Sequence, residues 1–524
     1  MLHRHWTRVV PRIAVAVGFC CLGLFGGQAL AAHHNTSSDT LVIGWNADGG
    51  PPPNTLDPTS TISNGNDWVY VNIFSELLHV ANNGTGLQPG LATTWKITNH
   101  GKTYTFHLRK NVEFSNGQKL KASDVVFSIN RGIASPNWGS LYPKFKSITA
   151  PNNSTVILKL NSPWAPLLSD LAFYDVGVYP ESYFKQVGAS GFANHPISAG
   201  PYELKSWSTV NNEVVLQKNP HYWDSSAYPM KYVDLLYTAN DNTRLEALQA
   251  GTIDVDEGLP TSLVPVAKGS SGIKVEYNRS TDIIVVTLND KLAQFKDLKV
   301  REAIDHAIGR QQLVKSILNG HGSPANSFIP KGALYWEPYS HLPVPTYSVT
   351  EAKKLLGQSH YKNGFSMTFE IPAGSQEFSE VATILQSELS KIHIKLNLIT
   401  VDPGTLNTNQ QSDNFHMLPT NWTNDIPDPD ELTSFAVSTA GGAHDWFTWY
   451  DNKQLDQLTA QGERVTNVKS RENIYYQIQS LFNRETPYYP LYYEPFINAV
   501  SSNVTSFSGQ NPFGYFDLQG VHKS

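Results

Sequence analysis

The segment from Thr103 to Ile129 reads TYTFHLRKNVEFSNGQKLKASDVVFSI, and it carries the clearest structural pattern in the chain. Its first part alternates strictly between apolar and polar residues, which is typical of a strand with one buried face. The apolar residues of this alternation are Tyr104, Phe106 and Leu108. Asn116-Gly117 then supplies a turn in which glycine can adopt a positive φ. An apolar helix that starts near Asp124 completes a predicted strand–turn–helix unit.

The same two periodicities recur on both sides of this segment. Apolar runs at Leu41–Ile43 and at Val156–Leu160 predict two further strands. Helical spacing predicts one helix that ends at Gly320, with the stripe Val300, Ile304, Ala307, Ile308, Val314, Ile317 and Leu318. A second stripe consists of Phe378, Val381, Leu385 and Ile392. Strands and helices interleave without a long linker, which predicts a mixed α/β protein whose lobes are joined by crossing strands.

Length and composition limit the class of protein. A chain of 524 residues is too long for one ordinary core, so we expect two or three lobes. Hydrophobic residues make up 40% and charged residues 16%, a globular composition that excludes extensive disorder. The formal net charge is −6. An acidic chain without a basic stripe is a poor candidate for nucleic-acid binding.

The first residues have the features of a secretory signal peptide. Arg4, Arg8 and Arg12 precede an apolar run at Ile13–Leu24 that is too short to anchor a protein in a bilayer. Small residues follow, and the pattern Ala29-Leu30-Ala31 predicts cleavage after the last of them. Loss of three arginines would take the formal charge to about −9. We therefore expect an exported, periplasmic product.

Both cysteines, Cys20 and Cys21, lie inside this segment. A lipoprotein anchored through one of them is the obvious alternative. Phe19 precedes Cys20, however, and a lipid-modified cysteine requires a small residue at that position. We therefore favour a soluble mature protein that has no cysteine, no disulfide and no thiolate for metal binding or catalysis.

Several motifs along the chain form an ordered set. In chain order they are Thr55-Leu56-Asp57-Pro58, Leu87–Ala92 with Trp95, Thr103–Ile129, Ala199–Tyr202, Asn219–Trp223, Leu248–Val255, Val300–Ala303 and Trp422–Asp425. Their order and spacing resemble the bacterial extracellular solute-binding proteins, family 5, that serve peptide, nickel and related importers. The resemblance runs from Val42 to Tyr493.

This resemblance implies an α/β fold, a two-lobe periplasmic-binding-protein clamp of type II-like form with an extra inserted subdomain. The implied divisions are a signal peptide at 1–31, lobe I at 32–80, 196–287 and 494–524, an inserted subdomain at 81–195, and lobe III at 288–493. Segments near Ile283–Asn289 and Leu491–Val500 would cross between the lobes as a hinge. The implied function is to capture a short peptide by lobe closure and deliver it to the permease and ATPase subunits of an importer. We expect a monomer.

The resemblance also points to a ligand-binding residue. In peptide-binding relatives, an acidic residue three positions after a tryptophan pairs with the ligand's α-ammonium group. Here these residues are Asp425 and Trp422, with Thr423 and Asn424 between them. A desolvated carboxylate suits a charge-assisted hydrogen bond to an ammonium group. The alternative is a loop carboxylate that only caps a turn, which is how we interpret Asp428 and Asp430.

Two further features bear on the ligand. Asn46, Ala47 and Asp48 are a candidate contact for an extended peptide backbone, and a plain surface loop is the alternative. Some dipeptide-binding relatives supply an arginine for the ligand carboxylate in the region that matches residues 371–389, which contains no Arg or Lys here. Strict dipeptide specificity is therefore disfavoured. Arg244 and Arg279 are possible substitutes, although each also fits a structural role.

Other functions have less support. A nickel chelate, a sugar or another small solute is an alternative ligand, but the 17 histidines show no H-x-x-x-H or H-E-x-x-H spacing. A secreted hydrolase would need a nucleophile, and no G-x-S-x-G motif occurs. No G-x-x-x-x-G-K-[ST] loop for ATP is present either. We predict no catalytic residue, no metal ligand and no cofactor.

Overall fold

The structure is a computed structural model that describes residues 37–45, 53–60, 64–81, 84, 86–331, 333–441, 448–507, 511–514, 516 and 518–524. The predicted signal peptide and the predicted contacts Asn46 and Asp48 lie outside these residues. No helix in the described ranges is long and apolar enough to cross a membrane.

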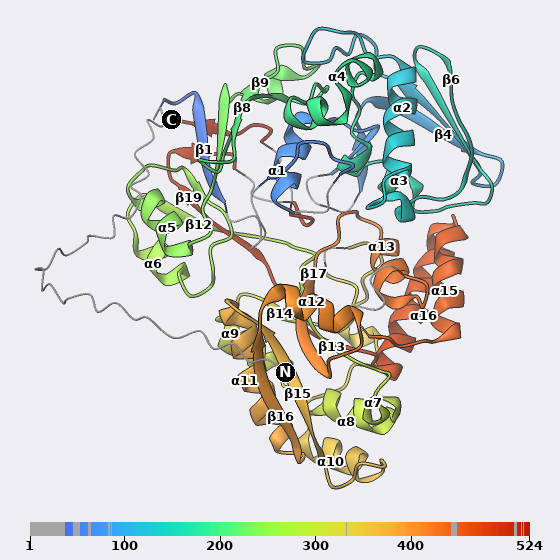
Figure 1. Ribbon diagram of the computed structural model, residues 1–524, viewed down its shortest axis with the longest axis vertical. Coiled ribbons are helices and arrows are strands. Elements are labelled where there is room, and N and C mark those ends of the chain that lie inside the picture. Colours follow the sequence, from blue (N-terminus) through green and yellow to red (C-terminus); the bar gives the residue numbers. More distant parts are fainter. Residues whose placement is uncertain are drawn as a thin grey trace, which may run out of the picture. The chain divides into compact units, whose positions relative to one another are not determined.

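The strand–turn–helix unit belongs to a four-stranded antiparallel sheet with the order β4-β5-β7-β6. Its strands are β4 (Ala92–Thr98), β5 (Thr103–Leu108), β6 (Phe145–Asn152) and β7 (Thr155–Leu160). The predicted alternation is confirmed, because Tyr104, Phe106 and Leu108 are buried. Gly117 forms the turn with φ of 79°. Helix α2 (Ala122–Ile133) then packs along this sheet (Figure 1).

Helix α2 begins two residues earlier than the sequence suggested. Its first helical residue is Ala122, and Lys121 occupies the N-cap position. The carboxylate of Asp124 accepts a hydrogen bond from the backbone N–H of Lys121 at 2.9 Å. This bond satisfies one of the donors that a helix start leaves open, so the cap needs no hydroxyl side chain.

A seven-stranded sheet is built from three separate parts of the chain. The strand order is β12-β19-β11-β1-β10-β9-β8. The strands are β1 (Thr40–Trp45), β8 (Tyr202–Ser208), β9 (Glu213–Lys218), β10 (Tyr232–Tyr237), β11 (Val255–Asp256), β12 (Ile273–Asn278) and β19 (Phe496–Ser501). The four-stranded sheet is therefore an insertion in the chain between β1 and β8. Every residue of β1 is buried, as expected for a strand paired on both sides.

A six-stranded sheet with the order β14-β18-β13-β17-β15-β16 forms the rest of the framework. Its strands are β13 (Ile283–Leu288), β14 (Ser323–Pro324), β15 (Phe365–Pro372), β16 (Ile394–Val401), β17 (Met417–Trp422) and β18 (Tyr489–Tyr493). Two short pairs complete the strands, β2 (Leu78–Val80) with β3 (Leu87–Pro89) and β20 (Val504–Thr505) with β21 (His522–Lys523). The prediction of interleaved strands and helices is confirmed.

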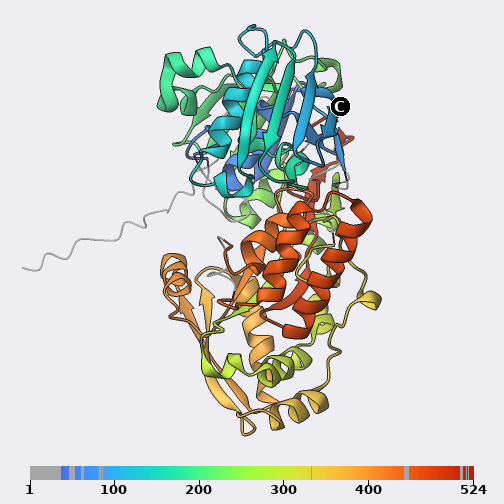
Figure 2. The same ribbon diagram turned by 90° about the vertical axis from the view of Figure 1, so that its right-hand side faces the viewer.

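The remaining helices connect these strands. They are α1 (Asn64–Ile73), α3 (Leu167–Asp170), α4 (Glu181–Asn194), α5 (Asp241–Gln249), α6 (Val264–Gly269), α7 (Ala293–Lys296), α8 (Leu298–Ala307), α9 (Arg310–Ile317), α10 (Val349–Gly357), α11 (Gln376–Ser390), α12 (Pro403–Gln411), α13 (Asp430–Leu432), α15 (Lys453–Arg464) and α16 (Val468–Glu485). Short helical turns are η2 (Gly139–Leu141), η3 (Tyr174–Val176), η4 (Ser225–Ala227), η5 (Tyr339–His341) and η6 (Thr433–Val437). Figure 2 shows α15 and α16 side by side in orange and red.

The single helix predicted to end at Gly320 is two helices, so that prediction was wrong in one respect. Helix α8 ends at Ala307, Ile308 is extended, and α9 starts at Arg310. The backbone N–H of Gly309 donates to the carboxylate of Glu388 at 3.0 Å, outside any helical bonding pattern. A side chain at position 309 would meet that carboxylate at 2.4 Å, so glycine permits the break. The apolar stripe itself is buried as predicted.

Two chain segments cross between the seven-stranded and six-stranded sheets. Residues 279–282 join β12 to β13, and residues 494–495 join β18 to β19. The backbone N–H of Glu494 donates to the carbonyl of Asp282 at 3.2 Å, so the two segments lie side by side. The first crossing precedes the predicted segment Ile283–Asn289, because residues 283–288 form β13 inside the six-stranded sheet. The second is shorter than the predicted Leu491–Val500, because most of that segment belongs to β18 and β19. The residue limits given above for the lobes stay a prediction.

Candidate ligand-binding site

The motif Trp422–Asp425 lies where β17 leaves the six-stranded sheet. Trp422 is the last residue of β17 and pairs with Ile283, the first residue of β13. Trp422 and Thr423 are half-buried, whereas Asn424 is fully buried. Asp425 is half-buried, and the next residue, Ile426, packs in the core that contains β1 and α1. The strand end therefore carries the predicted site residues from the six-stranded sheet to the core of the other part of the chain.

Thr281, in the first crossing segment, holds this strand end in place. Its hydroxyl lies 3.2 Å from the backbone nitrogen of Asn424, which donates to it. The same hydroxyl is 2.9 Å from the carbonyl oxygen of Pro512. The backbone N–H of Thr281 also donates to that carbonyl, at 2.6 Å. One buried threonine thus ties together the crossing segment, the end of β17 and the C-terminal part of the chain.

Asp425 shares its surroundings with a second carboxyl group that sequence reasoning did not single out. A carboxylate oxygen of Glu431 accepts hydrogen bonds from the backbone N–H groups of Asp425, at 2.9 Å, and of Ile426, at 3.3 Å. Burial raises the pKa of Glu431 well above its ordinary value, and the charge of Asp425 raises this pKa further. The two neighbouring carboxyl groups therefore resist a second negative charge, and burial favours the protonated form of Glu431, the more deeply buried of the two.

The turn after Asp425 is fixed by an internal ion pair. The carboxylate of Asp428 binds the guanidinium of Arg471 through both of its oxygens, and one of these contacts measures 2.7 Å. Arg471 also donates to the carbonyl of Gly462 at 2.7 Å. Both charged residues are buried, and a buried bidentate pair positions the backbone around it. This geometry gives Asp428 a structural role, as the sequence interpretation had it.

Several fully buried polar groups in this region have no partner among the described residues. They are the indole nitrogen of Trp45 and both amide atoms of Asn66 and Asn424. Buried polar atoms in proteins nearly always have a hydrogen-bond partner, either from the protein or from a bound molecule. Sequence composition and motif spacing could not identify these groups, because what distinguishes them is their burial in the fold and not their residue type.

Aromatic side chains surround the end of β1. The ring centroids of Trp45 and Trp68 are 5.7 Å apart, and those of Trp45 and Tyr237 are 6.4 Å apart. The ring centroids of Trp68 and Phe516 are 3.6 Å apart. Phe516 follows closely after Pro512, the partner of Thr281. Trp45 belongs to the same core as Ile426, so the end of β1 and the end of β17 reach one region.

Comparison with known proteins gives this geometry its context. Residues 86–444 match the bacterial extracellular solute-binding proteins, family 5 middle. This chain belongs to that family.

Relatives of this family 5 protein cover most of its length. Heme-binding protein A of Haemophilus influenzae is 25% identical over 480 residues, which cover 86% of this chain and 86% of that protein. The glutathione-binding protein GsiB of Escherichia coli is 26% identical over 435 residues, covering 80% and 82%. The periplasmic binding protein DppA from Helicobacter pylori, solved with the peptide STSA, matches with a TM-score of 0.75 and 25% identity, covering 92% and 98%. The predicted two-lobe periplasmic-binding-protein fold is confirmed.

Of the two arginines suggested as partners for a ligand carboxylate, Arg244 is already paired with other side chains in this family 5 protein. Arg244 is buried and already bonds Asp256 at 2.9 Å and Asp241 at 2.8 Å, so that suggestion was wrong. Arg279 is exposed and lies 3.4 Å from the carbonyl of Lys331.

The region that lacks Arg and Lys places an acidic residue beside the second crossing segment. The hydroxyl of Tyr492 donates to Glu377 at 2.6 Å. Burial raises the pKa of Glu494 well above its ordinary value, and the nearby charges of Glu377 and Asp282 raise it further. The surroundings of Glu377 therefore oppose an additional negative charge and do not suit a ligand carboxylate.

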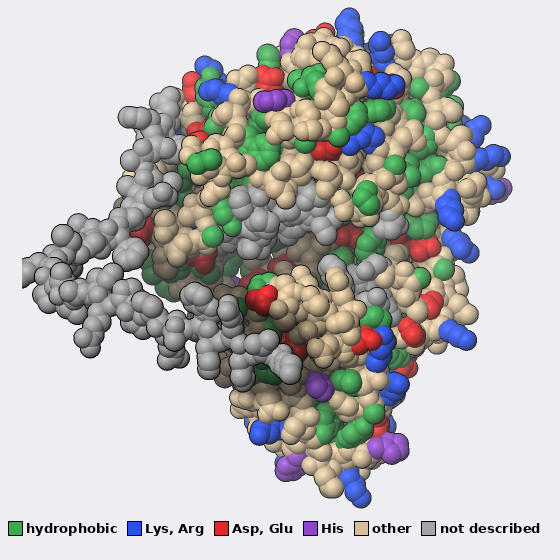
Figure 3. All heavy atoms as spheres, viewed as in Figure 1, with side chains coloured by type: hydrophobic (Ala, Val, Ile, Leu, Met, Phe, Trp, Pro, Cys, Tyr) green, Lys and Arg blue, Asp and Glu red, His purple; other side chains and the backbone are tan. Residues whose placement is uncertain are grey.

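The charges of this family 5 protein also bear on other ligand classes. No group of three or more His, Asp or Glu side chains in the described ranges could hold a metal ion. On the face seen in Figure 3, Lys and Arg side chains are spread singly and in small groups over the described surface. They form no stripe there of the kind that follows a nucleic-acid backbone.

Proposed function

We propose that this protein captures short peptides and delivers them to the permease of an ATP-binding cassette importer. Asp425 would bind the peptide's α-ammonium group, with Trp422, Thr423 and Asn424 completing the contact. Asn46 and Asp48 would pair with the peptide backbone. Closure of the lobes about the crossing segments would bury the ligand. The protein would act in the periplasm after signal-peptide removal, as a soluble monomer and without catalysis.

The observation that carries this proposal is the pairing of Asp425 with Glu431. A half-buried carboxylate beside a second carboxyl group suits a charge-assisted hydrogen bond to a cation, because each acid raises the cost of a negative charge on the other and a cation relieves it. Glu431 also fixes the backbone of Asp425, so the carboxylate is held in place before the ligand arrives. One relative is a glutathione-binding protein and another was solved in complex with the peptide STSA, and both favour a peptide as the ligand.

Blocking the peptide's amino group tests this assignment. Isothermal titration calorimetry with a tripeptide pool, free and N-acetylated, should show clearly tighter binding for the free form. Replacement of Asp425 by Asn should cost about 2–5 kcal/mol, the range for loss of one partner of a desolvated ion pair. The N-acetylated pool should bind the native protein with a comparable loss.

Asp413→Asn is the matched control, because Asp413 pairs with Lys291 at a partly exposed position away from the motif. It should leave peptide affinity unchanged. Equal affinity of free and acetylated peptides for the native protein would remove the assignment of Asp425. Mass spectrometry of molecules released from the purified protein gives an independent reading, and a heme, sugar or metal complex there would replace the peptide.

A further inference from the structure

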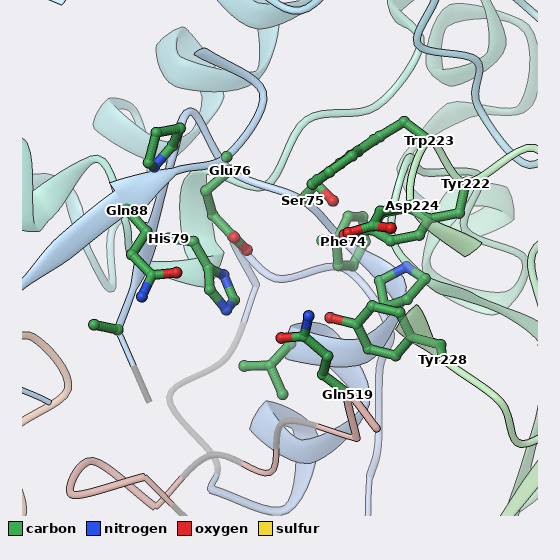
Figure 4. A pocket seen from close by; sticks show the side chains of 15 residues that line it. Phe74, Ser75, Glu76, His79, Gln88, Tyr222, Trp223, Asp224, Tyr228 and Gln519 are labelled. Atoms are coloured by element: carbon green, nitrogen blue, oxygen red, sulfur yellow. The ribbon is translucent and has the colours of Figure 1, made fainter. Parts of the chain in front are cut away.

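A cavity lies beside the C-terminal end of α1 and shares no lining residue with the Asp425 motif. Its volume is about 420 Å³, within the range of small-molecule sites. Residues from the end of α1, from β2 and β3, from the segment before β10 and from the C-terminal segment line it (Figure 4). In this view the side chains of Glu76, His79, Tyr228 and Gln519 point toward the same space.

Glu76 is the distinctive residue of this cavity. Its side chain is buried, with 7% of the residue exposed, and it lines the cavity wall. Among the described residues no side chain pairs with its carboxylate, and its own backbone N–H is the group that bonds it. Burial raises the pKa of Glu76 to about 8. A buried carboxyl group without a partner is costly, and such groups concentrate at functional sites.

The other lining residues favour a cationic ligand. Asp224 adds a second carboxylate, and none of the lining residues is Lys or Arg. Four aromatic rings, including Tyr228, form part of the wall. A protein cation already uses the face of one of them, because the guanidinium of Arg109 lies 3.8 Å from the ring centroid of Trp223. Aromatic faces and carboxylates together attract organic cations. A bare metal ion fits less well, because no group of metal-binding side chains occurs in the described part of the chain.

We propose that this cavity is a second ligand site, one that binds a small organic cation such as an aromatic or aliphatic amine, with Glu76 as its counterion. The site is independent of the peptide function proposed for Asp425. When the cation binds, Glu76 would give up its proton and become the negatively charged partner. Binding should therefore strengthen as pH rises through the pKa of that residue.

Other charged and titratable groups lie around this cavity. The guanidinium of Arg109 borders it, stacked on Trp223 and donating to the carbonyl of Gly90 at 3.4 Å. His79 and Asp224 share the cavity wall, and the hydroxyl of Tyr228 points into it. Asp175 is a further buried acid near Glu76. Burial raises the pKa of Asp175 well above its ordinary value, and the charge of Glu76 raises it further. Substitution of Glu76 alone therefore distinguishes its contribution to the pH dependence of binding from the contributions of these groups.

Benzylamine and its neutral analogue benzyl alcohol are suitable probes. Saturation-transfer NMR on the full mature protein measures the binding of each. Benzylamine should bind saturably, and benzyl alcohol should bind much more weakly. Glu76→Gln keeps the size of the side chain and should weaken benzylamine binding by about tenfold or more. Between about pH 6 and pH 9 the native affinity should rise, and the variant should lose this dependence.

Two further variants locate the amine. Asp425→Asn removes the ammonium site proposed for peptides, so the saturable benzylamine binding that should remain in this variant belongs to the cavity. Gln88→Lys introduces an ammonium group at an exposed lining position and should block the amine even if Glu76→Gln fails to fold. The proposal is overturned by absence of saturable benzylamine binding, by equal binding of the alcohol, by loss on Asp425→Asn, or by unchanged binding in both cavity variants.

Discussion

The backbone N–H of Asp425 donates a 2.9 Å hydrogen bond to the carboxylate of Glu431, six residues further along the chain. The two carboxyl groups are neighbours, and burial together with the charge of Asp425 raises the pKa of Glu431. Glu431 thus has two roles, since it fixes the backbone that presents Asp425 and it places a second, more deeply buried carboxyl group beside it. A pair of carboxyl groups that shares one proton carries a single negative charge, which suits a single cation.

Glu431→Gln should retain peptide affinity near neutral pH. Glutamine keeps an oxygen for the two backbone N–H groups and an N–H for Asp425, so the native neutral form is well imitated. Glu431→Ala removes that acceptor and should lower the free energy of unfolding by about 1–3 kcal/mol for the unsatisfied donors. Urea unfolding and peptide titration of both variants check this. A glutamine variant as damaged as the alanine variant would show that the charge of Glu431 is needed.

Asn424→Leu should separate ligand binding from stability. Asn424 is fully buried, and neither amide atom has a partner among the described residues. An apolar side chain of similar size would avoid burying unpaired polar atoms, so the melting temperature should stay the same or rise. If the amide contacts the bound peptide, affinity should fall by about tenfold. Scanning calorimetry and peptide titration give the two readings, and unchanged affinity would remove Asn424 from the site.

The sequence predicted the strands and apolar stripes well, because they depend on periodicity alone. Tyr104, Phe106 and Leu108 are buried as the alternation required. The break at Gly309 was missed because its cause is a hydrogen bond to Glu388, which is 79 residues away in sequence. Local spacing carries no information on such a contact.

The site was only partly accessible from sequence for the same reason. The Trp422–Asp425 motif could be found through family resemblance. Glu431 and Thr281 could not, because their roles follow from burial and from contacts between distant segments. Arg244 was a reasonable candidate by charge, but two carboxylates already bind it.

Asp170→Asn should change how stability depends on pH. Asp170, at the end of α3, is 2% exposed and accepts a 2.8 Å hydrogen bond from the indole N–H of Trp164, which an asparagine oxygen can also accept. Burial raises the pKa of Asp170 to about 8 from an ordinary value of 3.8. Between these values the folded chain holds a proton that the unfolded chain has lost, so stability falls as pH rises.

The asparagine variant lacks this titration. Relative to the native protein, its free energy of unfolding should therefore increase by about 1.4 kcal/mol per pH unit from about pH 4 to pH 8, as an upper limit. Urea unfolding at several pH values measures the difference. Parallel curves for the two proteins would show that Asp170 is ionised in the folded state. Glu76 and the other buried acids titrate in both proteins and cancel in the comparison.

A double-mutant cycle on Asp428 and Arg471 should show that this pair positions the turn after Asp425. Both residues are buried and contact each other through two hydrogen bonds. Arg471→Met or Asp428→Leu alone leaves an unpaired buried charge and should cost about 3–5 kcal/mol of unfolding free energy. The double variant should cost less than the sum of the two, because no charge is then left unpaired.

Peptide affinity should fall in each variant, since the turn that carries Asp425 loses its fixed end. Additive losses in stability would mean that the two side chains act independently, and a stable double variant with native affinity would mean that the turn is held by Glu431 alone.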